Sequence, residues 1–189
     1  MWMSKILLRF VPLAICMVHP LSAADTSDPA PAFTLMDHLG EKHTLDQYKG
    51  KWVVLEWVNF DCPFVKKHYV SNNMQNLQKT YTDKGVIWLS ICSSSKGKQG
   101  FLSSDEISSR IESHGAKPTA YLIDADGSVG KLYNAKTTPH MFVISPDGNL
   151  VYKGAIDSVP STSPDDVVGA ENYSIVSHAC FLAFVIIFV

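Results

Sequence analysis

The sequence has little of what marks several common classes of protein. Its formal net charge is only −2 over 189 residues, so nothing in its charge argues for nucleic acid as a partner. Its seven histidines are scattered without the spacing of metal ligands, so we predict no metal site, and we predict no cofactor. We find no internal repeat or low-complexity block. With 46% hydrophobic and 18% charged residues, the chain instead suits a single domain with a sizeable core.

Cysteine is scarce, and its distribution excludes a disulfide framework. Of the four cysteines, Cys16 lies in the leader segment described next, which leaves Cys62, Cys92 and Cys180 in the mature chain. Three cysteines spread so widely do not form the framework that staples a small domain, even in an exported protein. Any role of a cysteine is therefore chemical or a matter of packing.

The first 24 residues have the outline of a secretory signal peptide. Lys5 and Arg9 supply a basic start, residues 6–18 are mostly apolar, and residues 22–24 (Ser-Ala-Ala) are small enough for a cleavage site. We place the cut after Ala24 or Ala23. We therefore expect an exported protein, periplasmic or extracellular, whose mature domain spans residues 25–173.

The apolar run near the C-terminus is too short to cross a membrane. Residues 175–189 are almost wholly apolar, but they number fifteen, whereas a spanning helix needs about 20. This tail (residues 174–189) is an interfacial anchor, a buried final helix, or a frameshifted or truncated terminus, and we favour the last. The sequence leaves open whether the tail contacts a membrane.

The most informative part of the chain runs from residue 52 to residue 81. Residues 52–58 are β-branched and aromatic, which predicts a buried strand. A proline, Pro63, follows soon after, and proline favours the first position of a helix. Apolar residues then recur at steps of four, three and four, which predicts one helix face through this segment: Val70, Met74, Leu77 and Tyr81. Cys62 therefore lies at a helix N-terminus, beyond the carboxyl end of a buried strand.

That placement favours a reactive thiol at Cys62. Unpaired N–H groups and the helix dipole stabilise an anion at this end of a helix, and Lys66 and Lys67 add positive charge one turn further on. Both effects favour the thiolate, which is the nucleophilic form of cysteine. The alternative is a half-buried structural cysteine. We favour the reactive thiol because strand end, helix start, proline and two lysines converge on one sulfur.

The remaining segments alternate strands with helices. We predict strands over residues 33–35, 86–91, 119–123, 141–144 and 150–152, a helical turn over residues 44–48, a helix from a capping box at Ser103 to Gly115, and a short helical piece up to Tyr133. The segment between the last two strands reads Ser-Pro-Asp-Gly-Asn, which is a hairpin signature. Together these elements predict an α/β fold with a central mixed β-sheet, helices on both faces and a C-terminal β-hairpin.

At this point the chain resembles the thioredoxin superfamily, and within it the redoxin group of alkyl hydroperoxide reductase/thiol-specific antioxidant (AhpC/TSA) proteins. Residues 31–35 (Pro-Ala-Phe-Thr-Leu) and 48–51 (Tyr-Lys-Gly-Lys) resemble the redoxin N-terminal signature. Cys62 falls where that family carries its reactive cysteine. Thr138-Pro139 matches the superfamily's cis-proline, whose backbone faces that sulfur. The resemblance implies a thioredoxin-like fold over residues 31–173.

More narrowly, two segments resemble an exported, peroxiredoxin-like subgroup of redoxins, with TlpA-like thiol–disulfide proteins the next most similar. They are residues 62–69 (Cys-Pro-Phe-Val-Lys-Lys-His-Tyr) and 136–142 (Lys-Thr-Thr-Pro-His-Met-Phe). The chain departs from both standard active sites. Val65 stands where dithiol thioredoxins have a second cysteine, and Leu55 and Asn59 stand where peroxiredoxins have proline and threonine. Asn59 can still hydrogen-bond a peroxide oxygen, because its amide both donates and accepts.

Four further residues are candidates for a supporting role. His68 is a base or charge partner, or a solvated helix residue, and Glu56 is an inward proton relay or a carboxylate facing water. Cys92 could resolve an oxidised Cys62, although packing as a small hydrophobe is the stronger reading. His140 follows the cis-proline position and is placed to line a substrate groove.

We therefore expect an exported thiol oxidoreductase that reduces a small hydroperoxide. The Cys62 thiolate attacks the peroxide and becomes a sulfenic acid, Asn59 and Lys66 stabilise the departing oxygen, and an external thiol restores the enzyme. One alternative is exchange with a thiol or disulfide substrate through a mixed disulfide, with the Thr138-Pro139 backbone docking the substrate. The other is a binding module without redox turnover. The acidity and accessibility of Cys62 distinguish these alternatives.

Overall fold

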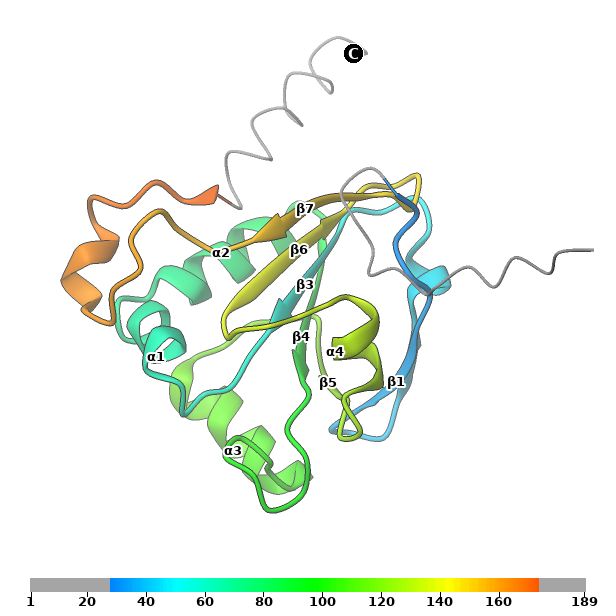
Figure 1. Ribbon diagram of the computed structural model, residues 1–189, viewed down its shortest axis with the longest axis horizontal. Helices are drawn as coiled ribbons and strands as arrows, with labels where there is room; N and C mark the ends of the chain where they lie inside the picture. Colours follow the sequence, from blue (N-terminus) through cyan, green and yellow to red (C-terminus); the bar gives the residue numbers. More distant parts are fainter. Residues whose placement is uncertain (1–27, 174–189) are drawn as a thin grey trace, which may run out of the picture.

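The computed structural model describes residues 28–173, so the predicted signal peptide, the apolar tail, Cys16 and Cys180 lie outside the described residues. One seven-stranded sheet, in the spatial order β2-β1-β5-β4-β3-β6-β7, organises this part of the chain (Figure 1). The strands are β1 (Thr34–Asp37), β2 (Lys42–Thr44), β3 (Val53–Trp57), β4 (Ile87–Cys92), β5 (Ala120–Ile123), β6 (His140–Ile144) and β7 (Leu150–Gly154). The helices are α1 (Pro63–Val70), α2 (Asn73–Thr82), α3 (Ser104–His114) and α4 (Ser128–Leu132), with 3-10 turns η1 (Leu45–Tyr48) and η2 (Pro164–Val167).

Strand β3 is the centre of the sheet, as its composition predicts. It pairs in parallel with β4 and antiparallel with β6, and all five of its residues are buried. Alternate side chains face opposite layers, so Leu55 and Trp57 enter one core while Val54 and Glu56 enter the other. Burial of the apolar side chains of β3 stabilises the fold by about 1.5–3 kcal/mol each.

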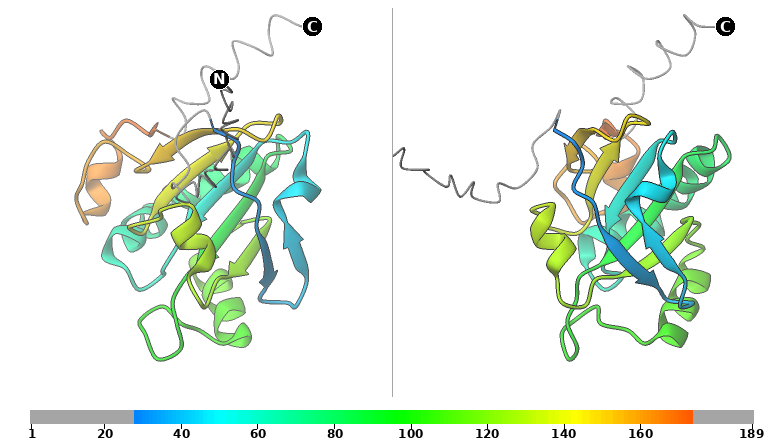
Figure 2. Two further views of the ribbon diagram at one scale, coloured as in Figure 1. Left: turned by 45° about the vertical axis from the view of Figure 1, so that its right-hand side comes forward. Right: turned by 90° about the vertical axis from the view of Figure 1, so that its right-hand side faces the viewer.

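Helices cover both faces of the sheet, and the predicted fold class is confirmed. Helices α1, α2 and α3 pack on one face through Val65, Met74 and Ile107, while α4 packs on the opposite face through Val129. The two helical layers stand apart on either side of the strands in the right-hand view of Figure 2. The parallel strands are β3, β4 and β5, and the β6–β7 hairpin closes the sheet in antiparallel fashion.

The helix predicted to run from Pro63 past Tyr81 is in fact two helices. Helix α1 ends at Val70, Asn72 adopts the left-handed conformation (φ 58°), and α2 begins at Asn73. Asparagine tolerates this backbone region better than most residues, so the chain changes direction there. Val70 is consequently 69% exposed rather than part of a continuous buried face. The sequence also gave no sign of β2, whose polar residues form an edge strand beside β1.

The ends of the central strands define one edge of the sheet. Trp57, the last residue of β3, pairs with Ile91 near the end of β4 and with His140 at the start of β6. The loops that follow β3 and β4 and the loop that precedes β6 therefore meet at this edge. The chain after β7 (residues 155–173) passes next to α1 (orange in Figure 1), where η2 contacts that helix. Within residues 28–173, no helix is long and apolar enough to cross a membrane.

Candidate functional site

Cys62 is the N-cap residue of α1, as predicted. Its own N–H donates to the carbonyl of Asn59 (2.9 Å), and its carbonyl accepts from the N–H groups of Val65 and Lys66 (3.0 and 2.9 Å). The backbone of Cys62 is extended (φ −68°, ψ 128°), and its side chain does not cap the helix. Cys62 thus stands at the N-terminal, positive end of the α1 helix dipole.

The sulfur of Cys62 contacts the loop that precedes β6. The Sγ atom lies 3.2 Å from the carbonyl oxygen of Thr138, to which the thiol donates, and the Thr138–Pro139 peptide bond is cis. The Cys62 side chain is neither buried nor fully exposed. A thiolate has no proton to donate to this carbonyl, so ionisation releases the contact and leaves the sulfur free to meet another molecule. The structure therefore brings Cys62 together with Thr138 and Pro139.

Asn59 is held between two neighbouring segments. Its Oδ1 accepts from the N–H of Asp61 (2.9 Å), while its side chain packs so closely on Gly100 that a Cβ there would lie 2.7 Å from it. Gly100 has a φ of +86°, a conformation that also favours glycine. The loop after β4 thereby fixes the orientation of Asn59 three residues before Cys62.

An ion pair at the residue before Cys62 was not predicted from the sequence. Asp61 has its Oδ1 2.8 Å from Nη2 of Arg110 on α3. The guanidinium compensates the charge of the Asp61 carboxylate and ties the loop after β3 to α3. The two residues are 49 positions apart, so no local spacing signals the pair.

Glu56 points inward, which settles the choice that the sequence left open. Its carboxyl group is fully buried and accepts four hydrogen bonds, of 2.8–3.3 Å, from Trp88 Nε1, Ser90 Oγ, Gln78 Nε2 and Tyr69 OH. Burial raises the pKa of Glu56 above its ordinary range, while the four donors act in the opposite direction. These partners belong to α1, α2 and β4 rather than to the Cys62 loop.

The two lysines predicted to act on the sulfur behave differently from each other. Lys66 is exposed one turn beyond Cys62, as expected, but Lys67 is 1% exposed and bonds to Asp157 on the chain after β7. Asp157 therefore compensates the charge of Lys67. The prediction that Lys67 acts on the Cys62 sulfur is wrong. His68 is likewise buried, and its ring faces Asp157.

Cys92 and His140 lie on either side of β3. Cys92 is buried at the end of β4, and its thiol donates to the carbonyl of Gly100 (3.4 Å), whereas the Cys62 thiol is engaged on the β6 side. Both cysteines are free thiols, and the two sulfurs bond to different carbonyls, those of Thr138 and Gly100. His140 packs on Phe142 with a ring distance of 4.5 Å, and burial together with nearby lysines lowers its pKa.

Two hollows meet at the Thr138 backbone. One, of about 420 Å³, lies between Phe64 of α1, Pro139 and the chain after β7. The other, of about 510 Å³, lies between Asn59, the loop after β4 and the end of α4. Residues 137 and 138 line both, so a molecule in either hollow reaches the loop that carries the sulfur's partner carbonyl.

Comparison with protein families gives one assignment. The model of the AhpC/TSA family matches residues 26–153, which covers more than half of the chain. It ends within β7, so the chain that packs next to α1 lies beyond the match. No curated protein matches the sequence.

Solved structures share the fold over most of their length. An uncharacterised conserved protein from Geobacillus kaustophilus is 27% identical, with 76% of this chain and 78% of that one covered and a TM-score of 0.64. The thioredoxin domain of a thiol-disulfide oxidoreductase from Bacteroides vulgatus is 19% identical, with coverages of 78% and 97% and a TM-score of 0.56. A secreted disulfide oxidoreductase from Mycobacterium tuberculosis is 20% identical, with coverages of 72% and 92% and a TM-score of 0.53. The fold is therefore thioredoxin-like.

Proposed function

Because this chain belongs to the AhpC/TSA family and is an oxidoreductase, we propose that it reduces hydroperoxides through a single reactive cysteine, Cys62. The observation that carries the proposal is the place of this thiol: it belongs to the N-cap residue of α1, it is partly accessible, and it donates to the Thr138 carbonyl, a contact that ionisation releases. Val65 is fully buried at the position of a second thioredoxin cysteine, so no disulfide forms within this turn. A one-cysteine cycle fits this geometry.

The first step forms a sulfur–oxygen bond. The Cys62 thiolate attacks the terminal oxygen of the hydroperoxide, the O–O bond breaks, and the alkoxide that leaves takes a proton from water to become an alcohol. Cys62 is now a sulfenic acid. Because Oδ1 of Asn59 is already bonded, its amide N–H groups are the part that meets the departing oxygen, and the exposed ammonium of Lys66 stabilises the same charge.

The second half of the cycle needs an external thiol. One thiol condenses with the sulfenic acid to give a mixed disulfide and water, and a second thiol releases Cys62 and leaves as the oxidised disulfide. Cys92 serves packing in this scheme, because its sulfur is buried and bonded to Gly100. The free Thr138 carbonyl is a docking point for the incoming thiol compound once the Cys62 contact opens.

Thiol–disulfide exchange is the second candidate function. The solved structures of similar fold include proteins described as disulfide oxidoreductases, and the cis-proline loop contacts the sulfur. The absence of a second cysteine at Val65 weighs against it, since nothing local releases a mixed disulfide. We also propose that the protein is exported, because the first 24 residues have the composition of a signal peptide and one of these similar proteins is described as secreted.

Stopped-flow fluorescence of the reduced mature protein with stoichiometric hydrogen peroxide tests the proposal. We expect a fast change that is abolished in Cys62→Ser and retained in Cys92→Ser, with a sulfenic acid trapped on Cys62 at the end point. A rate no higher than that of a free thiol would exclude peroxide reduction and favour exchange with disulfides. A disulfide between Cys62 and Cys92 would contradict the one-cysteine cycle.

A further inference from the structure

The 420 Å³ hollow is built largely by chain that lies beyond the family match. Residues 155–161 form one wall, and the other wall comes from Phe64 of α1 and the Thr138–Pro139 loop. This wall is held in place by its own hydrogen bonds: the N–H of Ser158 donates to Glu171 (2.9 Å), and the N–H of Tyr173 donates to Ile156 (3.0 Å). The strand-like closure makes the wall a structured part of the protein.

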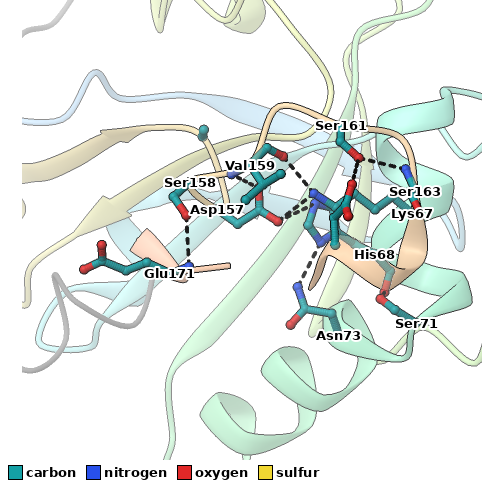
Figure 3. Close-up of polar contacts among 12 residues, drawn as sticks. Lys67, His68, Ser71, Asn73, Asp157, Ser158, Val159, Ser161, Ser163 and Glu171 are labelled. Atoms are coloured by element: carbon teal, nitrogen blue, oxygen red, sulfur yellow. Dashed lines mark hydrogen bonds and ion pairs between the residues drawn. The ribbon is translucent and has the colours of Figure 1, made fainter. Parts of the chain in front are cut away.

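A buried charge pair attaches this wall to α1. Nζ of Lys67 lies 2.9 Å from Oδ2 of Asp157 and 2.8 Å from the carbonyl of Val159, and Figure 3 shows these groups converging. The N–H of Val159 donates back to Asp157 (3.2 Å). Lys67 and Asp157 are 1% and 7% exposed at their side chains, so the pair is shielded from water and holds the wall firmly.

The ammonium of Lys67 has one N–H donor that can bond to another molecule. An ammonium group has three donors, and across the described chain the Lys67 ammonium has two acceptors, one on Asp157 and one on Val159. The lysine also lines the hollow. Because a buried donor without a partner is unfavourable, an acceptor atom placed in the hollow next to this lysine gains a hydrogen bond.

The charge around the hollow is already balanced. Asp157 neutralises Lys67, and Asn73 donates to Nδ1 of His68 (2.9 Å), so the proton of the His68 ring is on Nε2, which faces Asp157. Burial, reinforced by Lys67, lowers the pKa of His68 to about 4, so the ring is neutral at pH 7. An anion in the hollow would meet the Asp157 carboxylate without an uncompensated positive charge to offset its loss of water.

We propose that this hollow binds a small, uncharged, apolar molecule that offers one hydrogen-bond acceptor to Lys67. Most of the remaining exposed wall is apolar and includes Phe64, Pro139, Ile156 and Pro160, and a volume of about 420 Å³ is in the usual range for small-molecule sites. Thr138 lines the hollow, and its carbonyl oxygen is the acceptor of the Cys62 thiol, so a molecule bound here touches the same loop as the sulfur.

Binding is measured without chemistry in the Cys62→Ser protein. The probe is 2-phenyl-2-propanol, an uncharged alcohol with an aromatic body, and its counterpart carries an added para-carboxylate. We expect the alcohol to shift the amide NMR signals of residues 156–159 and the carboxylate to bind at least roughly tenfold more weakly. Equal or tighter binding of the carboxylate overturns the selection for uncharged molecules, and absence of binding overturns the site.

A pair of substitutions on one helix locates the binding. Phe64→Ala removes an apolar wall and should weaken binding of the alcohol about fivefold, whereas Val70→Ala changes an apolar residue of α1 that is more exposed and does not line the hollow. Equal effects of the two variants would overturn the location. If the wild type reacts with peroxide but Cys62→Ser binds no alcohol, the site fails and the function stands. If the alcohol binds but no peroxide is reduced, the function fails and the site stands.

Discussion

The two halves of helix α1 are organised in opposite ways. At its N-terminus, the Cys62 thiol is partly accessible and donates to the Thr138 carbonyl, and the preceding residue, Asp61, forms a partly exposed ion pair with Arg110. Towards its C-terminus, Lys67 and His68 are buried and bonded to other parts of the fold. A reactive thiol must be able to break its hydrogen bond and meet another molecule. Buried polar groups stabilise the fold only while they stay bonded to their partners. One short helix serves both needs because the effect of its dipole falls off beyond the first turn.

The largest expected effect is on the buried half. Lys67→Met leaves Asp157 buried without its partner, and we expect the free energy of unfolding to fall by about 3–5 kcal/mol in urea titrations. The double variant Lys67→Met/Asp157→Asn removes both charges and should recover at least half of that loss. The alkylation rate of Cys62 should change less than twofold in the folded protein. A double variant as unstable as Lys67→Met would show that the ion pair is not what holds this region.

Next in size is a pH effect from the same cluster. Burial lowers the pKa of His68 from 6.5 to about 4, with Lys67 adding to the shift and Asp157 opposing it. The unfolded chain therefore takes up a proton before the folded protein does. The stabilisation is fully present above pH 6.5 and is lost as the pH falls towards 4, with a total of about 3 kcal/mol at 1.36 kcal/mol per pKa unit. Urea titrations from pH 7.5 to 4 should show a shallower loss in His68→Gln, and equal slopes would contradict this assignment.

A smaller effect is expected at Glu56, which accepts a hydrogen bond from Tyr69 of the buried half. Its contribution to stability should change with pH in the direction opposite to that of His68. Glu56→Gln places amide N–H groups among four donors and should destabilise the fold by about 1–2 kcal/mol. Burial raises the pKa of Glu56, so its contribution is fully present below pH 4.5 and is lost as the pH rises through the raised value. The stability advantage of the wild type over Glu56→Gln should therefore shrink with rising pH. A growing advantage would show that the ionised form is the one preferred in the fold.

The smallest stability effect is expected at the reactive end. Arg110→Gln removes a partly exposed ion pair and should lower the free energy of unfolding by less than about 1 kcal/mol. It also leaves the carboxylate of Asp61, the residue before Cys62, without its positive partner, so we expect alkylation of Cys62 at pH 7 to slow roughly threefold. Adding Asp61→Asn should restore the rate. A rate that stays low in the double variant would mean that Arg110 acts by other means.

Local features of the sequence predicted the reactive half well. The apolar run before Cys62, the proline after it and the Thr138-Pro139 match placed the thiol at a helix start beside a cis-proline, and the structure has this arrangement. The capping box at Ser103 was also confirmed. These features depend on neighbouring residues, whose backbone preferences act over a few positions and can be read from the order of the chain.

The buried half could not be predicted in this way. Lys67 and Asp157 are 90 positions apart, and two consecutive lysines look alike until the helix turns one towards solvent and the other towards the chain after β7. The end of α1 was also missed, because apolar spacing continues across Asn72 while the backbone does not. The sequence also left open which way Glu56 points. Both faces of β3 are buried, so the strand has no alternation of polar and apolar residues that would show which face a side chain joins.

The sequence by itself determined the sheet's central strand, the position of Cys62 at a helix start and the family to which the chain belongs. Only the tertiary structure decided which charged side chains pair with each other, how Asn59 is held and where the 420 Å³ hollow lies. The physical reason is range. Backbone preferences and helix dipoles act within a turn or two, whereas compensation of a buried charge depends on residues that only folding brings within hydrogen-bond distance.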